Sequence, residues 1–173
     1  MTLAPHPKVV DALSAFADGN AIIRKHSTFD TDICSASDFA NALGYAAERI
    51  AKTVLVAERG IAPVSRLRNP VRCFGAVCLP APHKMNLKQV AGTFGWKACE
   101  MASSNELKNV LDYPSGGVSP LGLGEIRLIV DEVLLSFPTI LVGGGEVGVE
   151  VEILPAILIA LSNATVLGAN SNH

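Results

Sequence analysis

The chain has 173 residues, of which 49% are hydrophobic and only 17% charged, a length and composition that suit one domain with a sizeable core. Its formal net charge of −2 at pH 7 neither requires nor excludes a polyanionic partner. The N-terminus has no apolar segment behind a basic start, and the longest apolar stretches are broken by Ser or Pro. We therefore expect a cytoplasmic protein without a signal peptide or a transmembrane helix.

Helices and strands alternate at irregular intervals in the predicted order of elements. Apolar residues at helical spacing over residues 9–16 predict a first helix, and a short strand follows at 21–24. A second helix begins at an N-cap serine, Ser35 or Ser37, and ends at Gly44. The later elements are strands at 52–57 and 71–79, helices at 86–94 and 104–111, strands at 126–130, 139–142 and 149–153, and a helix at 155–163. This order predicts an α+β (mixed α/β) single domain with a mixed sheet.

Charges are segregated along the chain. Residues 59–99 contain no Asp or Glu but seven basic residues, whereas residues 100–173 hold nine acids and only Lys108 and Arg127 as basic residues. One electropositive region on an otherwise acidic molecule is typical of a surface that meets a phosphate backbone, although the same residues can also simply solvate the surface. The candidate phosphate contacts are Arg66, Arg68, Arg72, Lys84 and Lys88.

Sequence patterns of three common enzyme classes either miss the required spacing or stand in the wrong structural context. Residues 143–148 match GxGxxG, but the alternating Val and Glu residues that follow are typical of a strand, where a dinucleotide site needs a helix. Residues 117–122 miss the GxSxG elbow of serine hydrolases by one position. The four histidines and four cysteines lack zinc-ligand spacing, so we expect no metal, no cofactor, and reduced, buried cysteines. A glycine-rich site without an obvious nucleophile favours substrate-assisted chemistry or simple binding.

Three segments in fixed order resemble the YbaK family of prolyl-tRNA synthetase-associated (ProX-like) domains. The first, at 36–56, contains SDFANALG followed by ERIAKTVLV. The second comprises NLKQVA at 86–91 and the loop YPSGGVSPLG at 113–122. The third joins VDE at 130–132 with the glycine turn at 143–145. Together the three segments extend the resemblance over roughly residues 6–163. Its most specific feature is the GGVSPLG loop in combination with the Lys-Thr strand that precedes it in the sequence.

The resemblance implies a fold and a function. The expected fold is a compact, barrel-like mixed sheet flanked by helices, in one domain at 1–173 with a core at about 6–163 and a short tail at 164–173. The expected function is that of an aminoacyl-tRNA deacylase, which hydrolyses the ester bond of mischarged tRNA in trans. Its expected substrate is tRNA-Pro carrying a small amino acid such as Ala or Cys, and prolyl-tRNA synthetase is a candidate partner. A non-catalytic module that binds tRNA or its aminoacylated end stays open as the alternative.

The resemblance also implies site residues. Lys52 matches the family's essential lysine, and a lysine at neutral pH acts as a cation rather than a base unless it is strongly desolvated. The expected substrate-binding residues are Thr53, Gly116, Gly117, Val118, Ser119, Pro120, Gly143, Gly144, Gly145 and Glu150. Many relatives carry Ser-Ala-Gly at 143–145, so this chain lacks that hydroxyl and its side-chain specificity is open. The long connection at 59–69 is either a tRNA-contacting insertion or a plain loop.

Overall fold

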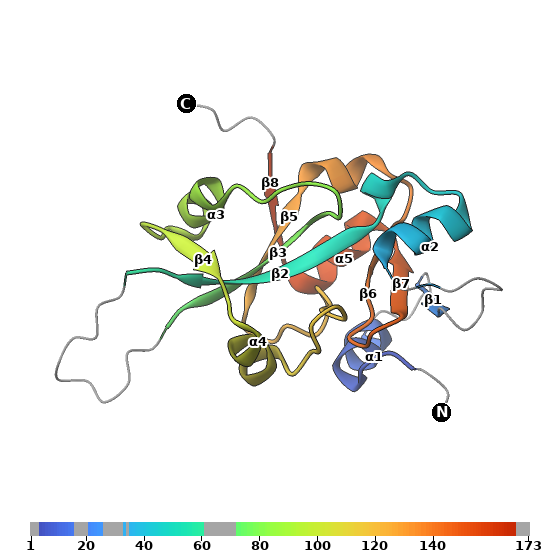
Figure 1. Cartoon of the computed structure of the whole chain (residues 1–173), viewed down its shortest axis with the longest axis horizontal. Coiled ribbons are helices and arrows are strands. Elements are labelled where there is room, and N and C mark those ends of the chain that lie inside the picture. The colour runs from blue at the N-terminus through green and yellow to red at the C-terminus, as the bar shows by residue number, and fades with distance from the viewer. Residues whose placement is uncertain (1–3, 16–20, 26–32, 34, 61–71, 169–173) are drawn as a thin grey trace.

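The computed structural model describes residues 4–15, 21–25, 33, 35–60 and 72–168 (Figure 1). Its elements are α1 (Pro7–Ser14), β1 (Ile22–Lys25), α2 (Ala36–Leu43), η2 (Ala47–Arg49), β2 (Ala51–Glu58), β3 (Phe74–Pro80), α3 (Leu87–Phe94), β4 (Cys99–Met101), α4 (Ser104–Leu111), β5 (Arg127–Asp131), η3 (Glu132–Ser136), β6 (Ile140–Gly143), β7 (Val149–Ile153), α5 (Pro155–Ser162) and β8 (Thr165–Leu167). None of the helices in this described part of the chain is long and apolar enough to cross a membrane.

The strands form two sheets rather than the barrel-like sheet that the resemblance led us to expect. The smaller sheet has the order β1-β7-β6 and the larger sheet the order β4-β2-β3-β5-β8. Pairing is parallel between β3, β5 and β8 and antiparallel elsewhere, so the larger sheet is mixed, as predicted. Within the described ranges, a bridge between Ile50 and Leu141 joins the sheets. A barrel needs a continuous ladder around its circumference, and this single bridge does not provide one.

The inner faces of both sheets share the main hydrophobic core. Leu55 and Val130 from the larger sheet pack with Val151 and Ile153 from the smaller sheet. Leu158 of α5 is fully buried in the same cluster. Because side chains alternate between the two faces of a strand, these contacts also determine which residues point outward.

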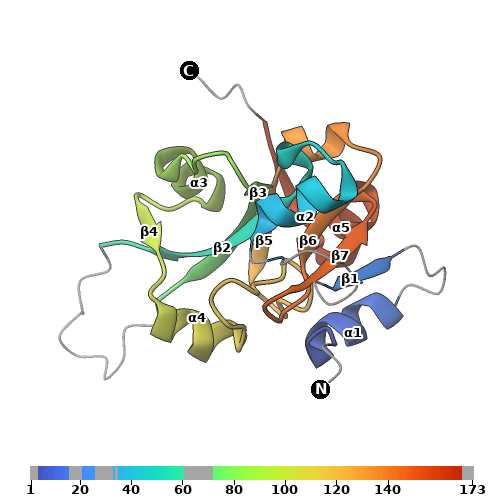
Figure 2. The same ribbon diagram turned by 45° about the vertical axis from the view of Figure 1, so that its right-hand side comes forward.

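Two helices cover the outer faces of the sheets. Phe94 of α3 packs on Val56 and Val77 of the larger sheet, whereas Phe39 of α2 packs on Leu141 of the smaller sheet. In the turned view, α2 lies beside β6 and β7, while α3 and α4 lie on opposite sides of the β2–β3 ribbon (Figure 2). The outer face of the smaller sheet is therefore closed by α2.

Local capping signals place the helix ends where the sequence predicts them. Ser35 is the N-cap of α2, and Asp38 completes a capping box with it. Gly44 ends α2 in the left-handed conformation, at φ +67°, which glycine adopts without a steric penalty. Ser103 and Glu106 form a second capping box at α4.

The sequence did not predict the shortest elements. The expected tail at 164–173 contains β8, which pairs with β5, so the ordered fold continues to at least Leu167. The strand β4 was missed in the same way. Each of these strands has three residues, which is too short for a period of two to stand out, and their pairing depends on tertiary contacts.

Two of the cysteines agree with the expectation of buried, reduced thiols, and one does not. Cys78 and Cys99 are buried free thiols, whereas Cys73 is exposed. Cys34 lies outside the described residues. Burial raises the pKa of Cys78 to about 12, so this thiol stays protonated and is a poor nucleophile at neutral pH.

Candidate active site

The strand β7 carries two carboxylates on its outer face. Val151 and Ile153 point into the core shared by the sheets, and Val149 on the same face of the strand is also buried. The alternate residues Glu150 and Glu152 therefore point to the face that α2 covers. The surroundings of these two acids differ sharply.

Glu152 has several hydrogen-bond and ion-pair partners. Its carboxylate accepts hydrogen bonds from Arg24 Nε at 2.8 Å, Tyr45 Oη at 2.8 Å and Thr139 Oγ1 at 2.7 Å. Arg49 Nη2 lies 3.5 Å from it, and the Arg49 guanidinium stacks on the Tyr45 ring. Burial alone raises the pKa of Glu152, but the hydrogen bonds from Thr139, Arg24 and Tyr45 outweigh it, and the pKa lies below its ordinary value. Glu152 is thus an ionised structural acid.

Glu150 has the opposite environment. Its Oε2 atom is buried and has no hydrogen-bond partner among the described residues. Burial raises the pKa of this carboxyl to about 8, so the neutral form prevails at pH 7. The side chain lines a pocket of about 320 Å³. The other lining residues are Ile33, Ser35, Ala36, Phe39, Gly116, Val147 and Gly148.

The raised pKa of Glu150 predicts how stability depends on pH. An acid with a raised folded-state pKa contributes its full stability below its unfolded-state pKa of 4.5, and this stability is lost as pH rises toward about 8. We expect the wild type to lose on the order of 4 kcal/mol more unfolding free energy than Glu150→Gln between pH 4 and pH 9. Urea unfolding of both proteins across this range measures the difference. Parallel pH profiles would show that Glu150 ionises normally in the folded protein.

A second pocket lies on the other side of the glycine loop. It measures about 260 Å³ and is lined by Thr53, Gly116 and Val118, with apolar walls from Leu55 and Met101. Gly116 lines this pocket and the Glu150 pocket, so the two meet at the loop. The Thr53 hydroxyl is buried and makes no hydrogen bond of good geometry within the described residues.

The two glycine-rich segments contact each other. A Cβ atom on Gly143 would lie 2.1 Å from the Val118 carbonyl oxygen, and one on Gly117 would lie 2.7 Å from the backbone carbon of Glu146. Gly145 has φ +84°, and a Cβ there would meet His6. The prediction of a tight strand-to-strand connection is confirmed, and the approaching groups are protein. A substrate contact by Gly143, Gly144 or Gly145 stays a prediction.

Gly143→Ala should disturb this contact. Because the obstructing atom is a backbone carbonyl, the loop must move, and we expect a loss of about 1–3 kcal/mol in unfolding free energy. Displacing Val118 should also lower catalytic activity. The control is Gly92→Ala in α3, where a Cβ meets nothing within 4 Å and alanine should be neutral or stabilising. Equal thermal stability and activity of the two variants would show that the loop does not depend on Gly143.

Lys52 lies on the same outer face as Glu150 and Glu152. Ile50 packs with Phe39 beneath α2, and Lys52 is two residues further along the strand, so it shares that face. The bridge from Ile50 to Leu141 brings the start of β2 alongside β6. Gly143, two residues after Leu141 on β6, pairs with Glu150 of β7. The Lys52 ammonium donates a hydrogen bond to the His83 carbonyl oxygen at 2.5 Å.

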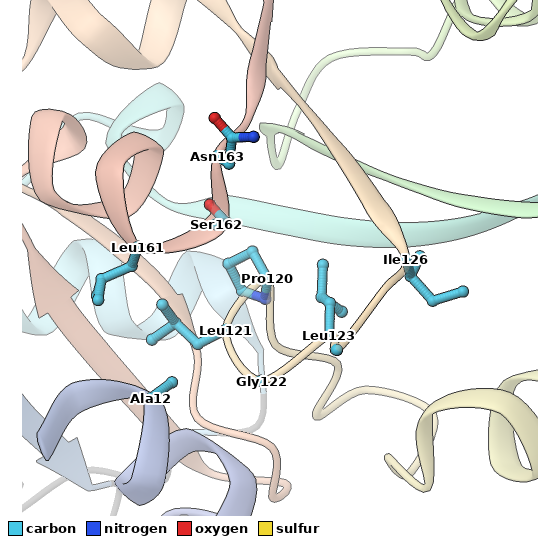
Figure 3. A pocket seen from close by; sticks show the side chains of 10 residues that line it. Ala12, Pro120, Leu121, Gly122, Leu123, Ile126, Leu161, Ser162 and Asn163 are labelled. Carbon is cyan, nitrogen blue, oxygen red and sulfur yellow. The ribbon is translucent and has the colours of Figure 1, made fainter. Parts of the chain in front are cut away.

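The rest of the GGVSPLG loop turns away from these pockets. Ser119 is fully buried, and its hydroxyl accepts a hydrogen bond from the Leu121 amide. Pro120 lines a separate pocket of about 310 Å³, together with Leu161 and Asn163 (Figure 3). The part of the loop that lines the pockets at Thr53 and Glu150 is thus its first half.

The candidate phosphate contacts fall into three groups. Lys84 and Lys88 are exposed and follow the turn that holds Lys52. Arg72 instead pairs with Glu100 and lies 3.3 Å from Glu106, so part of the segregated charge is neutralised within the fold. Arg66 and Arg68 lie outside the described residues.

The sequence did not identify the apolar walls of the two pockets. Ile33, Phe39 and Val147 line the Glu150 pocket, and Leu107 lines the Thr53 pocket. The only available signal was the apolar face of α2, and such a face normally indicates core. In the described part of the chain, no group of three or more His, Cys, Asp and Glu side chains could hold a metal ion.

Comparison with known proteins identifies the family. The family described as the aminoacyl-tRNA editing domain matches residues 30–161. A candidate Cys-tRNA(Pro)/Cys-tRNA(Cys) deacylase of Enterococcus faecalis, EbsC, is 27% identical over 133 residues, which cover 76% of this chain and 74% of EbsC.

Two solved structures share the fold. The hypothetical protein APE2540 is 25% identical, with a TM-score of 0.75 over 92% of this chain and 96% of its own. A candidate trans-editing enzyme for prolyl tRNA synthetase is 20% identical, with a TM-score of 0.75 over 95% of this chain and 98% of its own. With most of its length matched by the family, this chain belongs to the aminoacyl-tRNA editing domain family.

Proposed function

We propose that this protein hydrolyses the ester bond of mischarged aminoacyl-tRNA in trans, in the cytoplasm, and that its substrate is tRNA-Pro carrying a small amino acid such as Ala or Cys. The observation that carries the proposal is the convergence of separate segments of the family match. The proposed site residues Lys52, Gly116, Gly143 and Glu150 all belong to strands or loops that adjoin one another.

The chemistry needs no protein nucleophile. As water attacks the ester, negative charge develops on the carbonyl oxygen, and a fixed cation or backbone N–H groups can stabilise it. Lys52 is the proposed cation, and it holds either this oxygen or the 3′-terminal phosphate. The vicinal 2′-hydroxyl of the substrate orients the attacking water.

The pocket at Thr53 supports a small amino acid as substrate. Its walls include Leu55, Met101 and Leu107, and its polar side chains are hydroxyls such as those of Thr53 and Ser104. Apolar walls favour small apolar or weakly polar side chains such as those of Ala and Cys, because a charged side chain would lose its hydration without gaining a partner.

Exposed lysines support the tRNA part of the proposal. Lys84 and Lys88 follow His83 in the sequence, and the His83 carbonyl accepts a hydrogen bond from Lys52. Both lysines are exposed, so further positive charges follow the hydrogen-bond acceptor of Lys52 along the chain. We propose that they contact phosphates of the acceptor end. Prolyl-tRNA synthetase is the proposed partner, as the name of the similar trans-editing enzyme suggests.

A deacylation screen tests this function. Purified protein is mixed with Ala-, Cys-, Ser- and Pro-charged tRNA-Pro and with Cys-tRNA-Cys, with and without prolyl-tRNA synthetase. We expect rapid loss of Ala or Cys from tRNA-Pro and little loss of Pro. Binding of mischarged tRNA without hydrolysis, even with the synthetase present, would instead identify a non-catalytic binding module.

A further inference from the structure

We propose that Glu150 binds the α-ammonium group of the aminoacyl ester, so that the protein accepts esters with a free α-amino group and rejects N-acylated aminoacyl-tRNA and peptidyl-tRNA. This inference rests on the proposed deacylase function and specifies the substrate class of the same site. It begins from Glu150 Oε2, a buried atom without a hydrogen-bond partner among the described residues, in a side chain that lines a pocket.

Glu152 shows what a structural acid on this face requires. It receives hydrogen bonds or ion pairs from Arg24, Arg49, Tyr45 and Thr139. Glu150 is two residues away on the same strand, but its Oε2 atom has no such partner within the described residues. Buried polar atoms without partners are rare and costly in folded proteins. A ligand that enters the pocket would satisfy this one.

The charge of the carboxyl selects the ligand group. At the acylated 3′ end of tRNA the phosphates are anions, and they repel a carboxylate, whereas the α-ammonium is a cation. Burial keeps Glu150 largely neutral at pH 7 in the free protein, and an opposite charge in the pocket favours its ionised form. Pairing with the ammonium therefore gives Oε2, which has no partner among the described residues, a charge-assisted hydrogen bond.

The position of Lys52 suits the ester carbonyl of the same aminoacyl group. The bridge from Ile50 to Leu141 joins the start of β2 to β6, and Gly143 of β6 pairs with Glu150 of β7, so β6 lies between the strands that carry Lys52 and Glu150. An aminoacyl ester carries its ammonium and its developing oxyanion on neighbouring carbons, so the Glu150 carboxylate and the Lys52 ammonium, on the strands either side of β6, match its two charges. N-acylation removes the ammonium and with it the proposed partner of Glu150 Oε2.

The test compares Ala-tRNA-Pro with N-acetyl-Ala-tRNA-Pro. Each kcat/KM is divided by the uncatalysed hydrolysis rate of the same tRNA, because acylation of the amine also changes ester reactivity. We expect the wild type to prefer the free amine by roughly 10- to 100-fold, the factor that corresponds to a hydrogen bond to a charged group. Glu150→Gln, which keeps the shape but not the charge, should lose most of this preference, mainly through a higher KM for Ala-tRNA-Pro.

The matched control is Glu152→Gln on the same face of β7. It should melt at a lower temperature than the wild type but keep the preference for the free amine. Equal normalised rates on both tRNAs in the wild type overturn the inference and leave the deacylase function standing, whatever the stability of the variants. Full preference in a folded Glu150→Gln protein also overturns it. No hydrolysis of any unblocked tRNA is the separate failure of the proposed function.

Discussion

Replacing Lys52 with Ala is expected to slow deacylation of mischarged tRNA by roughly a hundredfold or more, the loss typical of removing one electrostatic stabiliser. The Lys52 ammonium, at the start of β2, donates a hydrogen bond to the His83 carbonyl oxygen. The variant therefore also loses a hydrogen bond within the fold. That bond is to a turn, and Lys52 is only partly buried, so we expect the fold to persist. Single-turnover rates and thermal melting measure the two effects.

Two further measurements refine the role of Lys52. Lys52→Arg should recover little activity, because a planar guanidinium does not reproduce the compact geometry of an ammonium. A substrate ending in 2′-deoxyadenosine should react slowly with the wild type if the 2′-hydroxyl orients water. Lys97→Ala, which removes an exposed charge, is the control for general electrostatic effects. If folded Lys52→Ala deacylates as fast as Lys97→Ala, the catalytic role of Lys52 is wrong.

Glu152→Ala is expected to destabilise the protein by on the order of 3 kcal/mol, because removing one member of a buried ion pair leaves the others uncompensated. Arg24 and Arg49 would lose their counter-charge, and the hydroxyls of Tyr45 and Thr139 would lose their acceptor. For a protein of this size the loss corresponds to a fall in Tm of about 10 °C. Calorimetry or circular dichroism measures it.

Glu125→Ala is the control for removing a glutamate, because Glu125 is exposed. Exposed substitutions usually change stability by less than about 0.5 kcal/mol. A Tm for Glu152→Ala within a degree or two of the control would show that the network around Glu152 contributes little. The two neighbouring acids of β7 would then not have the separate structural and functional roles that their surroundings indicate.

Local signals made much of the secondary structure predictable. Capping boxes set the starts of α2 and α4, Gly44 sets the end of α2, and alternating Val and Glu residues set β7 at 149–153. These signals act between residues a few positions apart, so they can be read without the fold. The family motif likewise identified Lys52, whose catalytic role stays a prediction.

Tertiary structure alone decided the arrangement around the site. In the sequence, Glu150 and Glu152 are equivalent acids on one face of a strand. Glu152 becomes structural because Arg24, Tyr45, Arg49 and Thr139 reach it, and all but Thr139 are more than 100 positions away in the chain.

Long-range contacts also decided the arrangement of the glycine segments and of the two sheets. The contact of Gly143 with the Val118 carbonyl, the pairing of β8 with β5, and the separation into two sheets all join residues distant in sequence. The sequence by itself determined which residues could form helices, strands and turns, because those preferences are local. Which acid was left with a partnerless oxygen depended on long-range packing, because burial and hydrogen-bond partners arise only when distant segments meet.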